Sequence, residues 1–307
     1  MLTDRRSRVL PSIALVVLWS SGFIGAELGT RQAPASALLA WRYLVAGGIL
    51  VALCAWRCER IDRSGLRRQV VLGLLCQAVY LGMTVSGVGL GVPSGTTALV
   101  ASMQPLVVIA LAALVLAERA RVAQLLGLVL GLTGVLLVVG GDLEAGDAPW
   151  WAYVLPFVGM LSLSLGTVLQ QRWRPRESVL ASITVQTVTA AGAFWLLALF
   201  EGTAGSATPP AFWAAIAWVV LLSSFGGYGT YLFVSRTQGA TYASTLLYLT
   251  PPTTMVWAAL MFGDQLSRAG LAGMLVSAVG VIVALTSAGR SRRAVTEESP
   301  VNAGSGR

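Results

Sequence analysis

Two charged side chains lie inside otherwise apolar runs of the chain, and they are the first candidates for chemistry. Arg42 lies within the apolar run 35–56, about 10 Å deep at roughly 1.5 Å per residue. A charge in hydrocarbon is costly, so such an arginine marks a binding site or a structural pair. Its planar guanidinium could hold a substrate carboxylate; the alternative is an ion pair with Glu27 or hydrogen bonds to the carbonyls of a broken helix.

Glu27 lies near the edge of the apolar run 9–28 and could carry a proton between access states or pair with Arg42. Proton-coupled pumps tend to place carboxylates or histidines well inside the membrane. This chain has no histidine, and the middles of its apolar runs carry no acid. These absences favour facilitated diffusion or exchange over proton-driven antiport.

Uncharged polar and aromatic side chains recur near the middle of the apolar runs. In lipid, amides and hydroxyls are expected to face the bundle interior or a cavity. Together with the arginine they would form a hydrogen-bonding, aromatic chamber; the alternative is that many of them join helices or bond to their own backbone. The candidate cavity residues are Trp19, Ser20, Arg42, Gln77, Tyr80, Gln104, Gln186, Tyr228, Tyr248 and Trp257.

Three prolines, Pro105, Pro251 and Pro252, fall near the middle of two apolar runs. Each proline removes a backbone N–H and frees the carbonyl four residues earlier. In hydrocarbon the freed carbonyls need new partners, so they are expected to face protein or a cavity. We predict hinges beside the binding site at these positions; the alternative is a static kink that helps packing.

The composition excludes several classes of protein. Of 307 residues, 56% are hydrophobic and 11% are charged, whereas soluble domains average about 25% charged residues. The chain has neither histidine nor lysine, which excludes a Walker A loop and argues against metal sites and histidine-based catalysis. We therefore expect a membrane protein that is not an enzyme, with no cofactor, no metal and no use of ATP.

Ten apolar runs of about 20 residues must position these side chains, since a helix of that length spans a bilayer. The runs are 9–28, 35–56, 69–88, 94–116, 122–140, 150–170, 179–199, 211–234, 241–262 and 268–288.

The arginines orient these helices. If the N-terminus is cytoplasmic, 18 arginines fall in inside segments, and Arg31 and Arg268 fall in outside loops. This asymmetry predicts that both termini are cytoplasmic. The net charge of +8 is therefore explained by topology, and we expect no nucleic-acid partner. The composition of residues 289–307 predicts a disordered cytoplasmic tail.

The chain also contains an internal repeat. With a shift of 146, residues 91–139 align with 237–285 without a gap, placing Pro105 on Pro251 and Glu118 on Asp264. A weaker match at a shift near 144 pairs Ser20 with Ser164 and Gly22 with Gly166. The first five-helix half, 9–140, and the second, 150–288, would therefore enter the membrane in opposite orientations. Such inverted repeats are typical of alternating access, with the site near the midplane.

Matched residues outside the candidate chamber suggest structural roles. We expect Glu118 and Asp264, just past the fourth and ninth helices, to cap or salt-bridge helix ends. The small-xxx-small pairs Gly127/Gly131 and Gly273/Ser277 permit close helix contact. These pairs could pack the two halves together or support a homodimer.

Two stretches of sequence resemble a known family. ALVASMQPLVVIALAALVLAERARVAQLLGLVLGLTGVLLVV resembles the fourth and fifth helices of an EamA domain, and STLLYLTPPTTMVWAALMFGDQLSRAGLAGMLVSAVGVIVAL resembles a second copy. The softer matches LWSSGFIGAELGTR and LLAWRYLVAGGIL resemble its first two helices. The resemblance to this drug/metabolite transporter superfamily implies ten helices in the plasma (inner) membrane and secondary transport, often export, of small metabolites. Gly263-Asp264-Gln265 departs from the common Gly-Glu-Arg.

These observations predict an all-α membrane protein of ten helices in two inverted repeats. The predicted function is secondary, non-ATP transport that exports small neutral or carboxylate-bearing metabolites, such as amino acids, by alternating access. Its expected partners are a small-molecule substrate and the lipid bilayer. One alternative is broader drug efflux, although cationic drugs would require a buried carboxylate that the midplane lacks. A channel or sensor is a further alternative, without the charge rings or repeated filter of a cation channel.

Overall fold

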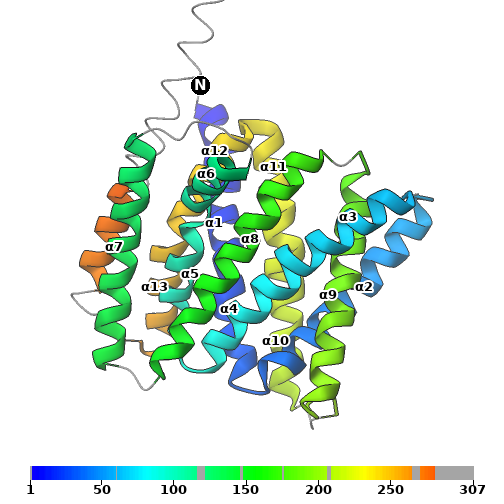
Figure 1. The fold of residues 1–307 in the computed structure, drawn as a ribbon, viewed down its shortest axis with the longest axis horizontal. Helices are drawn as coiled ribbons and strands as arrows, with labels where there is room; N and C mark the ends of the chain where they lie inside the picture. Colours follow the sequence, from blue (N-terminus) through cyan, green and yellow to red (C-terminus); the bar gives the residue numbers. More distant parts are fainter. Residues whose placement is uncertain are drawn as a thin grey trace, which may run out of the picture.

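The computed structural model describes residues 2–59, 61–115, 122–145, 148–174, 176–205, 209–264 and 270–280. These residues form helices joined by short turns and contain no strand (Figure 1). In chain order the elements are α1 Leu2–Thr30, α2 Ala35–Trp56, α3 Arg63–Gly73, η1 Leu74–Val79, α4 Tyr80–Gly89, α5 Ser94–Ser102, α6 Gln104–Val115, α7 Val122–Ala145, η2 Trp150–Tyr153, α8 Val154–Trp173, α9 Val179–Phe200, α10 Pro210–Trp218, η3 Val219–Gly227, α11 Tyr228–Gln238, α12 Ala240–Leu246, η4 Leu247–Leu249 and α13 Thr250–Phe262.

Eight helical segments are long and apolar enough to cross a membrane, and they coincide with the first eight apolar runs of the sequence. The ninth run, 241–262, is divided among α12, η4 and α13, and the tenth is described as the helix Gly270–Gly280. The first helix is longer than predicted, since α1 continues to Thr30. The predicted tail 289–307 and Glu118 lie outside the described residues.

Two of the spanning segments change from α-helix to π-helix near their middle. The π-helix η1 joins α3 to α4, and η3 joins α10 to α11. Another helix passes close to each: Gly22 of α1 lies against Ser223 of η3, and Gly166 of α8 lies against Cys76 of η1. A β-carbon at either glycine would collide with that neighbour. π-Helical turns commonly occur at functional sites, so both segments are relevant to the site.

The prolines start new helices where the sequence predicts a hinge or kink. Met103 interrupts the helix between α5 and α6, and Pro105 is the second residue of α6. Pro251 and Pro252 lie in the first turn of α13, after the short 3-10 segment η4. A proline is tolerated in a first helical turn because its missing N–H would have no intrahelical partner there. The fourth and ninth predicted helices are thus broken and restarted.

The helix α1 runs through the middle of the bundle and contacts α4, α5, α10, η3, α11 and α13 (Figure 1). The helix α2 packs along α9 at one edge, and α7 lies at the opposite edge beside the helix Gly270–Gly280 (Figure 1). Since α1 contacts elements from both halves of the chain, a site beside it is bordered by both.

Glycines allow α7 to approach the helix Gly270–Gly280 closely. A β-carbon at Gly280 would lie 2.6 Å from the carbonyl oxygen of Gly127, and one at Gly134 would collide with the backbone of Gly273 and Ser277. The small residues therefore join two helices of the same chain, as the first of the two sequence interpretations holds.

The apolar residues divide between the interior and the outer surface. One buried cluster joins α1, α2, α9, α10 and η3, and a second joins α5, α7, η2 and α8. Large apolar side chains also face outward, among them Leu114 (81% exposed), Phe200 (91%) and Leu260 (81%). Such exposure suits contact with hydrocarbon, where the backbone is satisfied within each helix.

Candidate functional site

Arg42 of α2 is held by neutral groups. Its Nη2 atom donates a hydrogen bond to Ser224 Oγ of η3 at 3.2 Å, and its guanidinium carbon lies 5.8 Å from the ring centre of Tyr43. The phenol groups of Tyr80 and Tyr228 lie within electrostatic range of the guanidinium. No carboxylate of the described residues forms an ion pair with Arg42.

The two tyrosines near Arg42 occupy equivalent places in their helices. Tyr80 is the first residue of α4 after η1, and Tyr228 is the first residue of α11 after η3. The extra residue in each π-helical turn rotates the side chains that follow around the helix axis. Tyr228 leaves 51% of its surface accessible, and its ring centre lies 5.6 Å from that of Trp19 on α1. We call Trp19, Arg42, Tyr80 and Tyr228 the Arg42 site.

The Arg42 site is suited to binding. A guanidinium without a carboxylate partner offers parallel N–H donors that match a substrate carboxylate. The rings of Trp19 and Tyr228 offer apolar faces for the rest of a small amphipathic molecule. A hydroxyl, a phenol and a guanidinium provide hydrogen bonds without supplying the general base that a nucleophile requires.

Two predicted cavity residues, Gln77 and Gln186, take part in a ladder of amides between α3–η1 and α9. Gln77 Nε2 donates to Gln186 Oε1 at 3.3 Å, and Gln186 Nε2 donates to Gln69 Oε1 at 2.7 Å. Gln69 Nε2 donates in turn to Glu177 Oε2 at 3.5 Å, and Thr187 Oγ1 donates to Gln77 Oε1 at 3.3 Å. These contacts join helices, which is the alternative that the sequence left open for these amides.

Gln69 was not selected as a site residue from the sequence, although its spacing from Gln77 indicates a shared polar face. It lies eight residues before Gln77, about two helical turns, so both amides are on one face of the segment. In the structure Gln69 is fully buried. A buried amide in an apolar segment requires polar partners, and its spacing from Gln77 indicates the face on which they lie.

Ser20 and Gln104 lie at the two helix breaks. Ser20 Oγ of α1 donates to the carbonyl of Thr250, the residue before Pro251, at 3.5 Å. Ser164 Oγ of α8 lies 3.5 Å from the carbonyl oxygen of Gln104, the residue before Pro105, while its shorter hydrogen bond, 2.8 Å, goes to Met160 O of its own helix.

The Gln104 side chain faces α8, where its Nε2 donates to Thr167 Oγ1 at 3.2 Å. Each break is therefore fastened to a neighbouring helix by polar contacts.

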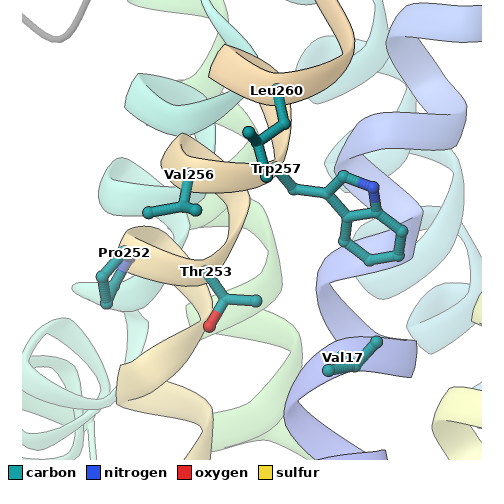
Figure 2. Close-up of a pocket in the computed structure, with 6 residues that line it drawn as sticks. All are labelled: Val17, Pro252, Thr253, Val256, Trp257 and Leu260. Atoms are coloured by element: carbon teal, nitrogen blue, oxygen red, sulfur yellow. The ribbon is translucent and has the colours of Figure 1, made fainter.

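Tyr248 and Trp257 form their described contacts with residues outside the Arg42 site. Tyr248 packs against Leu106, and its buried hydroxyl has no hydrogen-bond partner among the described residues. Trp257 lines an apolar groove of about 460 Å³ between α13 and α1, with Val17 on the facing helix (Figure 2). Pro252 also lines this groove, so one of the predicted hinges borders it.

Glu27 pairs with Arg31 and not with Arg42. Arg31 Nη2 donates to Glu27 Oε1 at 2.7 Å, one helical turn later in the chain. The Arg31 guanidinium also lies 4.3 Å above the ring centre of Phe262, at the end of α13. Asp264 follows Phe262 closely, and burial raises its pKa while nearby Arg31 opposes that change.

Comparisons with known proteins identify the class. The family model of the EamA-like transporter family matches residues 8–140 and 150–286, most of the chain. The chain therefore belongs to the EamA-like transporter family, as its resemblance to EamA domains predicts, and is a multi-pass membrane transporter.

Several curated proteins are similar over most of their length. The "Uncharacterized inner membrane transporter YedA" of Escherichia coli (strain K12) is 25% identical over 257 residues, 83% of each chain. The "Probable amino-acid metabolite efflux pump" of Salmonella typhimurium is 22% identical over 281 residues, covering 89% of this chain and 92% of that protein. The "Probable terminal-alkyne amino-acid exporter" of Streptantibioticus cattleyicolor is 27% identical over 293 residues, covering 92% and 95%.

A solved crystal structure has the same fold. It aligns with a TM-score of 0.61 at 21% identity, covering 91% of this chain and 97% of its own.

Proposed function

We propose that the chain is a secondary transporter of the plasma membrane that exports small metabolites bearing a carboxylate, amino acids foremost. The observation that carries this proposal is the guanidinium of Arg42, which is held by the neutral hydroxyl of Ser224 and has no carboxylate partner among the described residues. Two of the similar proteins have amino acids in their names.

The substrate would lie between α1, α2, α4 and α11. Arg42 would bind its carboxylate, with Tyr80 and Tyr228 as further hydrogen-bonding groups. The ring of Trp19 would pack on the apolar part of the molecule. This arrangement disfavours hydrophobic cations, because a guanidinium repels them and no carboxylate pairs with Arg42 among the described residues.

We propose alternating access between two inverted halves, 9–140 and 150–288. Reciprocal contacts support this proposal. Ser20 of the first half contacts the carbonyl before the first proline of α13, and the matched Ser164 of the second half lies at the same distance, 3.5 Å, from the carbonyl before the proline of α6. The two π-helices, η1 and η3, also fall at corresponding positions.

The glycine contacts are reciprocal too: Gly134 faces Gly273, and Gly280 faces Gly127. Under the shift of 146, each of these pairs maps onto the other. In this mechanism the helix breaks at Pro105 and Pro251 act as hinges, opening the Arg42 site first to one side and then to the other.

Counterflow in proteoliposomes tests this proposal. Purified protein is reconstituted into vesicles loaded with one unlabelled metabolite of a panel, amino acids first, and trace label is added outside without a pH gradient. We expect label to accumulate with at least one carboxylate-bearing cargo. Protein that is monodisperse and folded, yet accumulates no label with any member of the panel, would contradict the proposal. Accumulation with organic cations alone would instead support drug efflux.

A further inference from the structure

A second group of polar residues lies where α1 ends, away from the Arg42 site. The side chain of Glu27 is only 12% exposed. Its Oε1 atom accepts a hydrogen bond from Arg31, while its Oε2 atom is buried and has no hydrogen-bond partner in the described part of the chain. The hydroxyl of Ser94, the first residue of α5, lies beside this carboxyl group. Ser94 is 0% exposed, and its Oγ atom also has no hydrogen-bond partner among the residues that the structure describes.

Two further carboxyl groups approach from other elements. Asp264, after α13, lies within electrostatic range of both Glu27 and Asp142 of α7. Asp142 accepts a hydrogen bond from Thr96 of α5, and the phenol of Tyr153 is near it. The charged groups that face Glu27 in the described part of the chain are Arg31 and Asp264. Three acids therefore share this region with a single described cation that pairs with one of them.

The arrangement fits a proton better than a metal ion. No three acids, cysteines or histidines of the described residues lie close enough together to hold one metal. The Ser94 hydroxyl can donate to an ionised Glu27 Oε2 or accept from a protonated one, so it accommodates both states. Charge favours the proton, because protonation of Glu27 removes one of the like charges that Glu27 and Asp264 bring close together.

We propose that Glu27, with Asp142 and Asp264, forms a proton-binding site at the Arg31 end of the bundle. A neutral Glu27 no longer forms an ion pair with Arg31. Since Arg31 is stacked on Phe262, the pair connects the end of α1 to the end of α13. Proton uptake would loosen this connection beside the groove that separates the two helices. Only this coupling to movement rests on the transport function proposed above; proton binding itself does not.

The test is infrared difference spectroscopy of the full-length protein in lipid, which detects protonated carboxyl groups without any substrate. We expect a protonated-carboxyl band to form in the wild type on acidification to a pH at which exposed carboxyl groups, which titrate near 4, are still ionised. Glu27→Gln is expected to lose most of this band. Glu201→Gln is the matched control and is expected to keep it.

Glu201 is an exposed carboxyl at the same end, because Thr203, two residues on, contacts Ser36 at the start of α2. Absence of the band in the wild type, or an equal band in Glu27→Gln, would overturn the proposal. If Glu27→Gln does not fold, Asp264→Asn serves instead. Removing its like charge is expected to move the midpoint of the band to lower pH, and an unmoved midpoint would count against the cluster.

Two further arms separate the explanations. Replacing choline by sodium is expected to leave the band unchanged, and its loss in sodium would assign the site to that ion instead. A failure of counterflow with every cargo would remove the transport proposal, whereas the infrared titration would still decide the proton site.

Discussion

Replacing Arg42 by glutamine removes the guanidinium that the Arg42 site offers to a carboxylate and keeps a side chain able to hydrogen-bond Ser224. In the structure Arg42 Nη2 uses one of its N–H groups to donate to the Ser224 hydroxyl at 3.2 Å. An arginine side chain has five N–H donors in a fixed fork, so donors remain for a substrate. Arg42→Gln is therefore expected to weaken carboxylate binding while leaving the fold intact.

The expected size follows from the hydrogen bonds lost. A hydrogen bond to a charged group contributes about 1.5–3 kcal/mol, and a carboxylate can take two from one guanidinium. The glutamine amide can still donate a weaker, neutral hydrogen bond, so the net loss of binding free energy is about 2–3 kcal/mol. That loss corresponds to a roughly 30- to 150-fold weaker apparent affinity.

The assay is counterflow with the amino acid that proves active, compared with its neutral carboxamide. The variant is expected to lose affinity for the amino acid and to handle the carboxamide as the wild type does. Arg57→Gln is the matched control, because Arg57 is an exposed arginine at the end of the same helix. Equal losses for both cargoes, or no loss in a folded variant, would refute direct contact between Arg42 and the carboxylate.

Three further predictions concern hinges, packing and pH. Pro105→Ala and Pro251→Ala each restore a backbone N–H that can continue the helix. Both variants are therefore expected to slow counterflow while substrate binding, measured by calorimetry, persists. Unchanged counterflow rates would favour static kinks. Gly134→Ala places a β-carbon against a facing backbone and is expected to destabilise by about 1–3 kcal/mol in thermal unfolding. Gly140→Ala on the same helix meets nothing within 4 Å and serves as its control.

Asp62 caps α3, and hydrogen bonds from Ser64 and the Gly65 N–H lower its pKa. Its stabilising contribution is therefore full above the ordinary value of 3.8 and is lost as pH falls through the lowered value. Asp62→Asn should flatten this acid-side decline in the unfolding temperature, and identical pH profiles would contradict it.

Much of the fold could be predicted because hydrocarbon imposes helices of a fixed length on apolar sequence. The first eight runs illustrate this, since each coincides with a spanning segment. The ninth run could not be predicted as two helices by hydropathy, because its break depends on backbone bonding at Pro251 and Pro252. The π-helices were also unforeseen, since hydrophobic periodicity does not report a single inserted residue.

The site was predicted less completely, because side-chain partners depend on distances that spacing alone does not set. The sequence selected Arg42, Trp19 and both tyrosines, which the fold brings together. It did not indicate Ser224, since a serine in an apolar run commonly bonds to its own helix. It offered Arg42 as a partner for Glu27, whereas α1 continues far enough for Arg31 to take that place.

The ladder of glutamines has an electrical consequence for a membrane that stores a proton gradient. Gln77, Gln186 and Gln69 carry hydrogen bonds in one direction from mid-depth toward Glu177. An amide hydrogen-bonds through both of its ends but does not ionise near neutral pH. The ladder therefore holds α3 to α9 through polar contacts, and none of its three amides offers an ionisable step along that line. A carboxyl group in place of Gln69 would add an ionisable step to this path.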